Sequence, residues 1–398
     1  MRAPVRALAI GLATLLVFAG AAHAAWKEDV TLGGYLRESP FLWNPTVILS
    51  PAPAGDTPYF TNMVHTRQNL RVYFPHSISL GLELKTRLVT GDAAQQFLDL
   101  ANVAGGNRTY FDWEHRFIDD ERAVLAMVLD RAWLNASVGR TQITLGRQRV
   151  AWGTGLVWNP IDIFNPSSPL DFDNEEKPGA DAGRVQVYLG PNSKLEVAVA
   201  PMRDTDETVA AVQAVVNRAG YDWIAVGGRR GANAVMGGAW AGSIRGGGFR
   251  GEFLYSVPRD AAAPGDPAGE SCLHASVDGD YTFSSSLYLH GAVLYNQCGT
   301  TGDAGGEQLF DAYRLRWLTP ARVNVFAEVG RDITALVHAD LSGILNPNDA
   351  SWYLGPAVTW SAATNLDVML SGLFFGGNAG TQFGDDGDIG MLWLKWSF

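Results

Sequence analysis

The stretch RQNLRVYFPHSISLGLELKTR, residues 67–87, contains two runs in which apolar and polar side chains alternate. In the first run an apolar face opposes a basic one: Leu70, Val72 and Phe74 against Arg67, Asn69 and Arg71. After Pro75 the division recurs, with Ile78, Leu80, Leu82 and Leu84 against Glu83, Lys85 and Arg87. A period of two is that of a β-strand, whose successive side chains point to opposite faces. Charges beside an unbroken aliphatic face predict strands that separate lipid from water.

The same alternation recurs along the chain in segments of about 8 to 13 residues. Tight turns and long polar loops separate these segments in alternation, which is the layout of a transmembrane barrel. A closed barrel is also the β-architecture that a bilayer tolerates, because every backbone amide finds a partner within the ring. The sequence therefore predicts an all-β, antiparallel up-and-down transmembrane barrel that forms a single domain, residues 25–398.

We expect about 18 strands, because an even number returns both chain ends to the periplasm. Besides those of residues 67–87 and one near 30–37, they lie near residues 124–138, 141–152, 184–190, 194–202, 208–218, 222–230, 233–244, 248–257, 272–282, 286–296, 308–318, 322–333, 351–361, 365–375 and 387–398. One alternative stays open: residues 209–217 could form a short helix in a loop, which would leave about 16 strands.

Long loops are expected at residues 43–62, 91–122, 153–183, 258–271, 297–307 and 376–386. They hold clusters of acidic residues, such as Asp119, Asp120 and Glu121, so much of the formal net charge of −11 should lie at the outer surface. Such loops either reach lipopolysaccharide through bridging divalent cations or are simply well solvated.

The N-terminus has the features of a signal peptide. Arg2 and Arg6 precede the short apolar run of residues 7–19, and Ala22-His23-Ala24 supplies small residues for cleavage before Ala25. The apolar run is shorter than the about 20 residues that a membrane-spanning helix needs. We therefore expect residues 1–24 to be removed on export.

The C-terminus ends in a strand with an apolar face. Leu392, Leu394, Trp396 and Phe398 fall on one side at a period of two. A terminal aromatic residue in this setting resembles the C-terminal signal of bacterial outer-membrane proteins, which implies that the barrel-assembly machinery binds Phe398. Both ends thus indicate the outer membrane. Tryptophans are expected in the girdles at its interfaces, namely Trp43, Trp152, Trp352, Trp360, Trp393 and Trp396.

The two cysteines, Cys272 and Cys298, are equally far from a predicted turn centred on Ser285. They should therefore lie opposite each other on adjacent strands, near the extracellular end. Opposed side chains on a hairpin are within bonding reach. Since export brings the chain into an oxidising compartment, the sequence predicts a disulfide.

The inward faces of these strands give candidate pore-lining residues. They are Arg37, Arg67, Arg71, Glu83, Lys85, Arg87, Arg131, Arg147, Arg149, Arg184, Glu196, Arg250, Glu252, Asp278, Asp280, Arg314, Arg316 and Glu328. One wall would be basic and the other mixed. Rows of arginine and lysine favour anions in pores, although the same residues could instead pair across the lumen and brace the wall.

Arg147 and Arg149 fit this scheme only with a local irregularity. Strict alternation places them on the face of Ile143 and Leu145, towards lipid, where each unpaired arginine would cost about 2–4 kcal/mol. A β-bulge at Gly146 would return both to the lumen, and glycine is common in bulges.

Residues 146–166 contain Gly-Arg-Gln-x3-Trp-Gly-x-Gly followed by Asn-Pro-x-Asp-x-Phe-Asn-Pro. This segment resembles a group of largely uncharacterised proteobacterial outer-membrane, porin-like proteins. The resemblance implies a barrel of porin type and no particular substrate. In general porins the third extracellular loop folds inward and narrows the pore. Residues 153–183 are the third loop by position, so the constriction candidates are Trp152, Trp158, Asp162 and Phe164. The alternative is that this loop only caps the rim of the barrel.

We therefore expect a porin-like channel for passive diffusion of small polar or anionic solutes, without catalytic residues, metal or cofactor. A scaffold that sheaths a periplasmic partner or serves polysaccharide export is the alternative. An enzyme is less expected, because no serine nucleophile accompanies the paired acid and histidine at Asp280 and His290. Basic residues dispersed at strand spacing argue against nucleic-acid binding. Trimers are common among porins, but no residue identifies a trimer face.

Overall fold

The computed structural model describes residues 29–44, 58–92, 94–104, 109–164, 177, 179–259 and 267–398. The expected signal peptide, and the acids of the third loop from Asp171 to Glu176, lie outside these residues. Within the described ranges, no helix is both long enough and apolar enough to cross a membrane.

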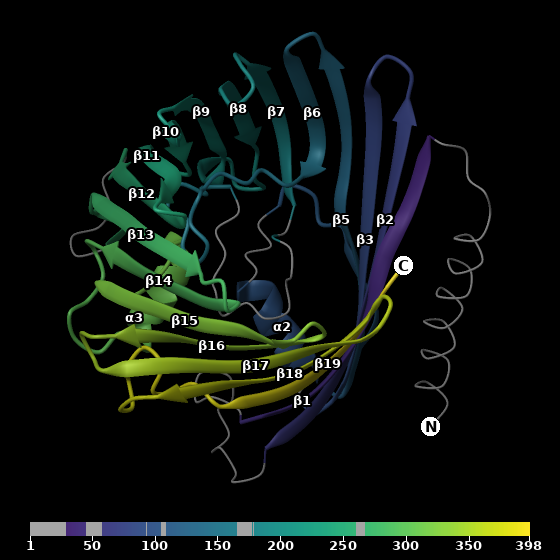
Figure 1. Ribbon diagram of the computed structural model, residues 1–398, viewed down its shortest axis with the longest axis vertical. Coiled ribbons are helices and arrows are strands. Elements are labelled where there is room, and N and C mark those ends of the chain that lie inside the picture. The colour runs from purple at the N-terminus through teal and green to yellow at the C-terminus, as the bar shows by residue number, and fades with distance from the viewer. Residues whose placement is uncertain are drawn as a thin grey trace.

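The chain forms a closed antiparallel barrel, seen in Figure 1 as a ring of strands. Eighteen strands make the wall: β1 (Val30–Trp43), β2 (Tyr59–Phe74), β3 (Ile78–Gly91), β5 (Ala123–Val138), β6 (Thr141–Gln148), β7 (Ala180–Tyr188), β8 (Lys194–Ala200), β9 (Val209–Arg218), β10 (Tyr221–Arg230), β11 (Asn233–Ile244), β12 (Gly247–Pro258), β13 (Cys272–Thr282), β14 (Leu287–Asn296), β15 (Val323–Thr334), β16 (Val337–Asn346), β17 (Ser351–Ala363), β18 (Leu366–Gly376) and β19 (Ile389–Ser397). Pairing of β1 with β19 closes the ring. The predicted fold and strand number are confirmed, and the 16-strand alternative is wrong because residues 209–218 form β9.

Three further elements lie in the longer connections at one end of the barrel. The helix α2 (Ala94–Ala104) and the short strand β4 (Glu114–Asp120) lie between β3 and β5, and the helix α3 (Glu307–Leu315) lies between β14 and β15. Single 3-10 turns occur at Thr205–Glu207 and Pro267–Gly269. Strand β4 pairs with the upper part of β5, beyond the point where the shorter β6 ends. Strand β4 thus continues the wall beside β5 beyond the end of β6.

Two errors cancel in the predicted strand count. Residues 308–318 were expected to form a strand, but α3 occupies residues 307–315. Glu307 in its first turn and Arg314 in its last complement the helix dipole, and Arg314 pairs with Asp311 at 2.9 Å. The expected strands omit β16, although Ala339, Leu341 and Leu345 alternate with Asp340 and Ser342.

The predicted bulge at Gly146 is also wrong. Strand β6 keeps an unbroken register with both β5 and β7. The irregularity lies on β5, where Asp130 is an extra residue between the Glu83–Arg131 and Leu84–Leu129 pairs. Gly146 does need to be glycine, because its φ is +107° and a Cβ there would collide with the carbonyl of Ala132.

The outward face carries exposed apolar side chains on strands all round the ring, for example Leu134, Val185, Met236 and Leu370. Of the tryptophans expected in girdles, Trp352, Trp360 and Trp396 are exposed on this face. The others lie elsewhere: Trp43 and Trp152 are buried, and Trp393 lies beneath the guanidinium of Arg37 inside the barrel. Tryptophan content alone therefore does not identify the girdle.

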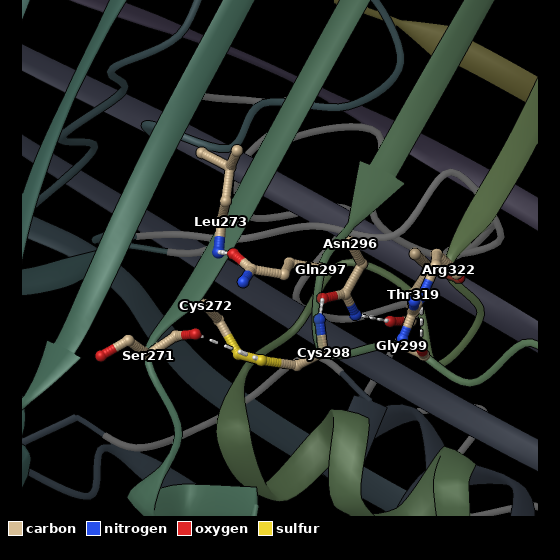
Figure 2. Close-up of a disulfide and its surroundings, with 9 residues drawn as sticks. All are labelled: Ser271, Cys272, Leu273, Asn296, Gln297, Cys298, Gly299, Thr319 and Arg322. Atoms are coloured by element: carbon tan, nitrogen blue, oxygen red, sulfur yellow. Dashed lines mark hydrogen bonds between the residues drawn. A yellow bond between two sulfur atoms is a disulfide. The ribbon is translucent and has the colours of Figure 1, made fainter.

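The predicted disulfide is present between Cys272 and Cys298, with their Cα atoms 5.7 Å apart. Figure 2 shows it joining the start of β13 to the chain that leaves β14. Nearby, Asn296 donates to the Thr319 carbonyl at 2.8 Å, and Arg322 donates to the Gly299 carbonyl at 3.1 Å. These contacts fix both ends of the connection that carries α3. By the loop-entropy model, closing a 26-residue separation contributes about 3–4 kcal/mol.

Alkylation of the denatured, unreduced chain should leave its mass unchanged, because both thiols are consumed in the disulfide. Reduction before alkylation should add two alkyl groups, measured by intact-mass spectrometry. The control variant Cys298→Ser should be alkylated at Cys272 without reduction. A mass gain in the unreduced parent chain would contradict the disulfide.

Candidate functional site: the barrel lumen

One half of the lumen wall carries an apolar cluster, beside buried polar residues such as Glu196 and Glu252. The inward side chains of β7 to β12 are mainly small: Ala180, Ala182, Ala198, Ala200, Val209, Ala211, Val226, Val235, Ala239 and Leu254. The connection between β6 and β7 packs on them through Val150, Trp152, Ile161, Ile163 and Phe164. We call its described residues, 149–164 with Lys177 and Gly179, the inward loop. It runs across the interior of the ring in Figure 1, next to this half of the wall.

Buried carboxylates on the wall hold the inward loop in place. Glu252 of β12 accepts the backbone N–H groups of Thr154, Gly155 (2.9 Å) and Ile161 (3.2 Å), and also the Thr154 hydroxyl (3.1 Å). Glu252 itself is 1% exposed. A buried carboxylate is stable only when hydrogen bonds replace its lost water, and the loop backbone supplies them. The loop and the wall therefore satisfy each other.

Two further anchors flank Glu252. The Trp152 indole donates to Glu196 of β8 at 2.9 Å, and the Leu156 backbone donates to Asp278 of β13 at 3.0 Å. Beyond them, the Trp158 ring lies edge-on to Phe326 of β15, with centroids 6.3 Å apart. The loop thus crosses the barrel from β6 to the β13–β15 wall.

All four constriction candidates lie inside the barrel on the inward loop. Trp152, Trp158, Asp162 and Phe164 are between 2% and 4% exposed. Asp162 pairs with Lys177 at 2.5 Å, and the Lys177 carbonyl accepts a hydrogen bond from Arg131 at 2.9 Å. The returning arm of the loop is therefore tied to β5.

Helix α2 is a second inward element. Ala94, Phe97 and Leu98 are buried in one cluster with Phe41 and Met63 of β1 and β2. Figure 1 shows α2 within the ring. The sequence interpretation placed residues 91–122 in a plain loop. The apolar spacing of Ala94, Phe97, Leu98 and Ala101 was the available signal for an amphipathic helix.

The wall opposite the inward loop is basic. The structure brings together Arg37, Arg67, Arg71, Lys85, Arg87, Arg131 and Lys395 from β1, β2, β3, β5 and β19, which we call the basic arc. Glu83 lies at its centre, 2.5 Å from Arg67, 3.0 Å from Arg71 and 3.4 Å from Arg131. Asp130, the bulge residue, binds Arg67 at 2.7 Å. These pairs hold the guanidinium groups in fixed positions along the wall.

Aromatic rings support two other members of the arc. Arg37 lies 4.3 Å from the centre of the Trp393 ring, and Lys395 lies 4.7 Å from that of Tyr35. Arg37 also contacts His65 Nδ1 at 3.2 Å. Cation–π contacts orient a cation without neutralising it. With its side chain 38% exposed, Arg71 is the member most open to the lumen among those with a stated ion pair to Glu83.

The wall of β12 to β15 is mixed in charge. Arg250 binds Asp278 at 2.6 Å and Asp280 at 2.5 Å, so two carboxylates pair with this one cation. His290 lies opposite Asp280 in the register, as expected, but its ring faces Glu328 at 3.5 Å. Across the described ranges, no three His, Cys, Asp or Glu side chains form a group that could hold a metal ion.

Five of the predicted pore-lining arginines lie outside the basic arc and the mixed wall of β12 to β15. Arg314 and Arg316 belong to α3 and the residues after it, because that segment is not a strand. Arg149 is exposed beyond the end of β6. Arg147 is buried, but it binds Asp181 at 2.8 Å and stacks on Trp113, 4.7 Å away, which clamps the β3–β5 connection to the wall. Arg184 lies 4.0 Å from Glu196, near the inward loop.

Solved structures of similar architecture include that of the outer-membrane protein OprD from Pseudomonas aeruginosa. The chain superposes on OccAB4 of Acinetobacter baumannii with a TM-score of 0.58 and 8% identity, over 94% of this chain and 99% of that one. OprD of Pseudomonas aeruginosa superposes with a TM-score of 0.58 and 11% identity, over 95% of this chain and 97% of that one. OccK9 (OpdG) of the same organism superposes with a TM-score of 0.56 and 13% identity, over 93% of this chain and 98% of that one. No protein-family model and no curated sequence matches. At these identities the likeness establishes the fold: this chain is built like the OprD and Occ barrels.

Replacing Glu252 with alanine should loosen the inward loop, because three backbone N–H groups lose their acceptor. Each orphaned donor costs about 1–3 kcal/mol, so amide exchange over residues 152–161 should become roughly a hundredfold faster. Hydrogen-exchange mass spectrometry measures this. The matched control is Glu328→Ala, whose carboxylate faces His290 and not the loop. Equal exchange in the parent chain and E252A would disprove the anchoring role.

Proposed function

We propose that this protein is an outer-membrane channel for passive diffusion of small polar or anionic solutes. The observation that carries the proposal is the division of the interior. The inward loop packs on the apolar wall of β7 to β12, while the basic arc faces the lumen from the other side. Fixed cations along a water-filled path attract anions and guide polar solutes. The architecture shared with OprD and OccAB4 supports this function and the outer-membrane location.

In this proposal the inward loop and α2 set the width of the path. Both insert side chains into the lumen, and Trp158 of the loop reaches the cluster that contains α2. A lumen filled in this way leaves little room for a protein partner, which argues against the sheath alternative. Delivery would follow cleavage before Ala25, and insertion would use Phe398 as the signal to the assembly machinery. A homotrimer would be the usual porin assembly.

Single-channel recording in a planar bilayer should show steady conductance with anion preference under a salt gradient. Arg71→Gln should lower the anion-to-cation permeability ratio roughly fivefold, because one charge at about 4 Å in water is worth about 1 kcal/mol. Arg218→Gln, the same charge change at an exposed residue at the end of β9, should leave the ratio unchanged.

Two outcomes would overturn parts of the proposal. A folded barrel without conductance would mean that loops or a partner block the lumen, and the channel function would fail. Conductance with the same reversal potential in the parent chain and R71Q would leave a channel whose selectivity does not depend on Arg71.

A further inference from the structure

Arg230 is a buried cation outside the basic arc. It is the last residue of β10, on the same inward face as Val226, and is 8% exposed. Among the described residues its side chain has neither a hydrogen bond nor an ion pair, and the charged group that acts on it is another cation, Arg316. Burial of a guanidinium is unfavourable unless an anion compensates it. In the part of the chain that the structure describes, Arg230 is therefore a buried positive charge with no bound counterion.

Arg316 reaches this region from the connection that carries α3. It binds Glu207, which precedes β9, at 3.2 Å. Its φ of +57° is uncommon for a residue with a side chain. Arg316 thus extends from the β14–β15 connection to the residues that lead into β9.

His274 of β13 lies near both Arg230 and the segment that carries Arg316. It is 3% exposed, its Nε2 is enclosed without a hydrogen-bond partner, and the charge of Arg230 acts on it. The ring of Trp317, next to Arg316, lies 6.3 Å from the His274 ring. Ser256, on the adjoining strand, also has a buried hydroxyl without a partner. Unsatisfied buried polar groups normally indicate a missing partner.

The disulfide makes this arrangement rigid. Cys272 is two residues before His274, and Cys298 begins the segment that leads to Arg316. The contacts of Asn296 and Arg322 in Figure 2 fix that segment at its base. A preorganised site loses less conformational entropy when it binds a ligand.

We propose that Arg230, Arg316 and His274 form a binding site for a small oxyanion, with a phosphate or carboxylate group as ligand. Guanidinium groups bind both through paired N–H donors, and His274 offers a further polar contact. Arg230 and His274 face the interior of the barrel, where lipid headgroups do not reach. The ligand is therefore a freely diffusing anion. The site is distinct from the basic arc, and binding does not require that the channel conducts.

The test uses the refolded, oxidised chain in detergent, with inorganic phosphate as the probe. Calorimetry should show saturable binding, and phosphate should raise the temperature of barrel unfolding, seen by heat-dependent gel mobility. Arg230→Met should weaken binding at least tenfold. Without phosphate the same variant should unfold at a higher temperature than the parent, because an uncompensated buried charge is removed. A purely structural Arg230 would give the opposite sign.

A second variant and a control complete the experiment. Arg316→Gln, at a partly exposed residue, should also weaken phosphate binding. Arg71→Gln on the basic arc should bind phosphate as the parent does. Acetate in place of phosphate distinguishes the two ligand groups, since the one that binds more tightly identifies the preferred chemistry. Absence of binding of either anion, or loss of binding in R71Q but not in R230M, would overturn the proposal.

Discussion

Within the hydrocarbon of a membrane every backbone N–H and C=O must find its partner inside the protein, and the whole architecture depends on this constraint. The ring meets it where the chain ends join. Gly34 and Phe398 exchange two backbone hydrogen bonds of 3.0 Å, and a Cβ at Gly34 would collide with the Arg67 carbonyl. Once the ring is closed, side chains are free to divide between lipid and lumen. The basic arc can exist because the backbone around it needs nothing from solvent.

Inside the ring, a second division follows from side-chain size and charge. Alanine and valine line β7 to β12, where the inward loop buries its isoleucines and aromatic rings. Arginine and lysine line the wall on the other side, where Glu83 and Asp130 organise three guanidinium groups. The anchors of the loop lie between these regions, at Glu252 and Asp278. Charge is thus concentrated on one side of the lumen because the loop occupies the other.

The sequence predicted the features that follow from the period of two along each strand. It did not predict the features that depend on which residues contact each other in the folded barrel. Alternation revealed most wall strands, and equal distances from a turn revealed the disulfide. Helix α3 was predicted as a strand and strand β16 was omitted, because a short amphipathic run can satisfy both the helical and the strand period. Glu252 was identified as inward-facing, but its role was not, since its partners are backbone N–H groups that leave no mark in the sequence. The sequence predicted a bulge at Gly146, but the bulge lies at Asp130. Glycine is common in bulges but is not required there, so a glycine does not locate one.

The alanines of the apolar wall have a consequence for how the proposed channel could change its calibre. Ala182, Ala198, Ala200 and Ala211 allow the inward loop to lie close against the strands. Larger side chains at these positions would displace the loop towards the basic arc and shrink the free cross-section, with no change in the loop itself. The width of the path is therefore encoded partly in the strands behind the loop, so a family of such barrels could diversify in the solutes it admits through substitutions that never touch a solute.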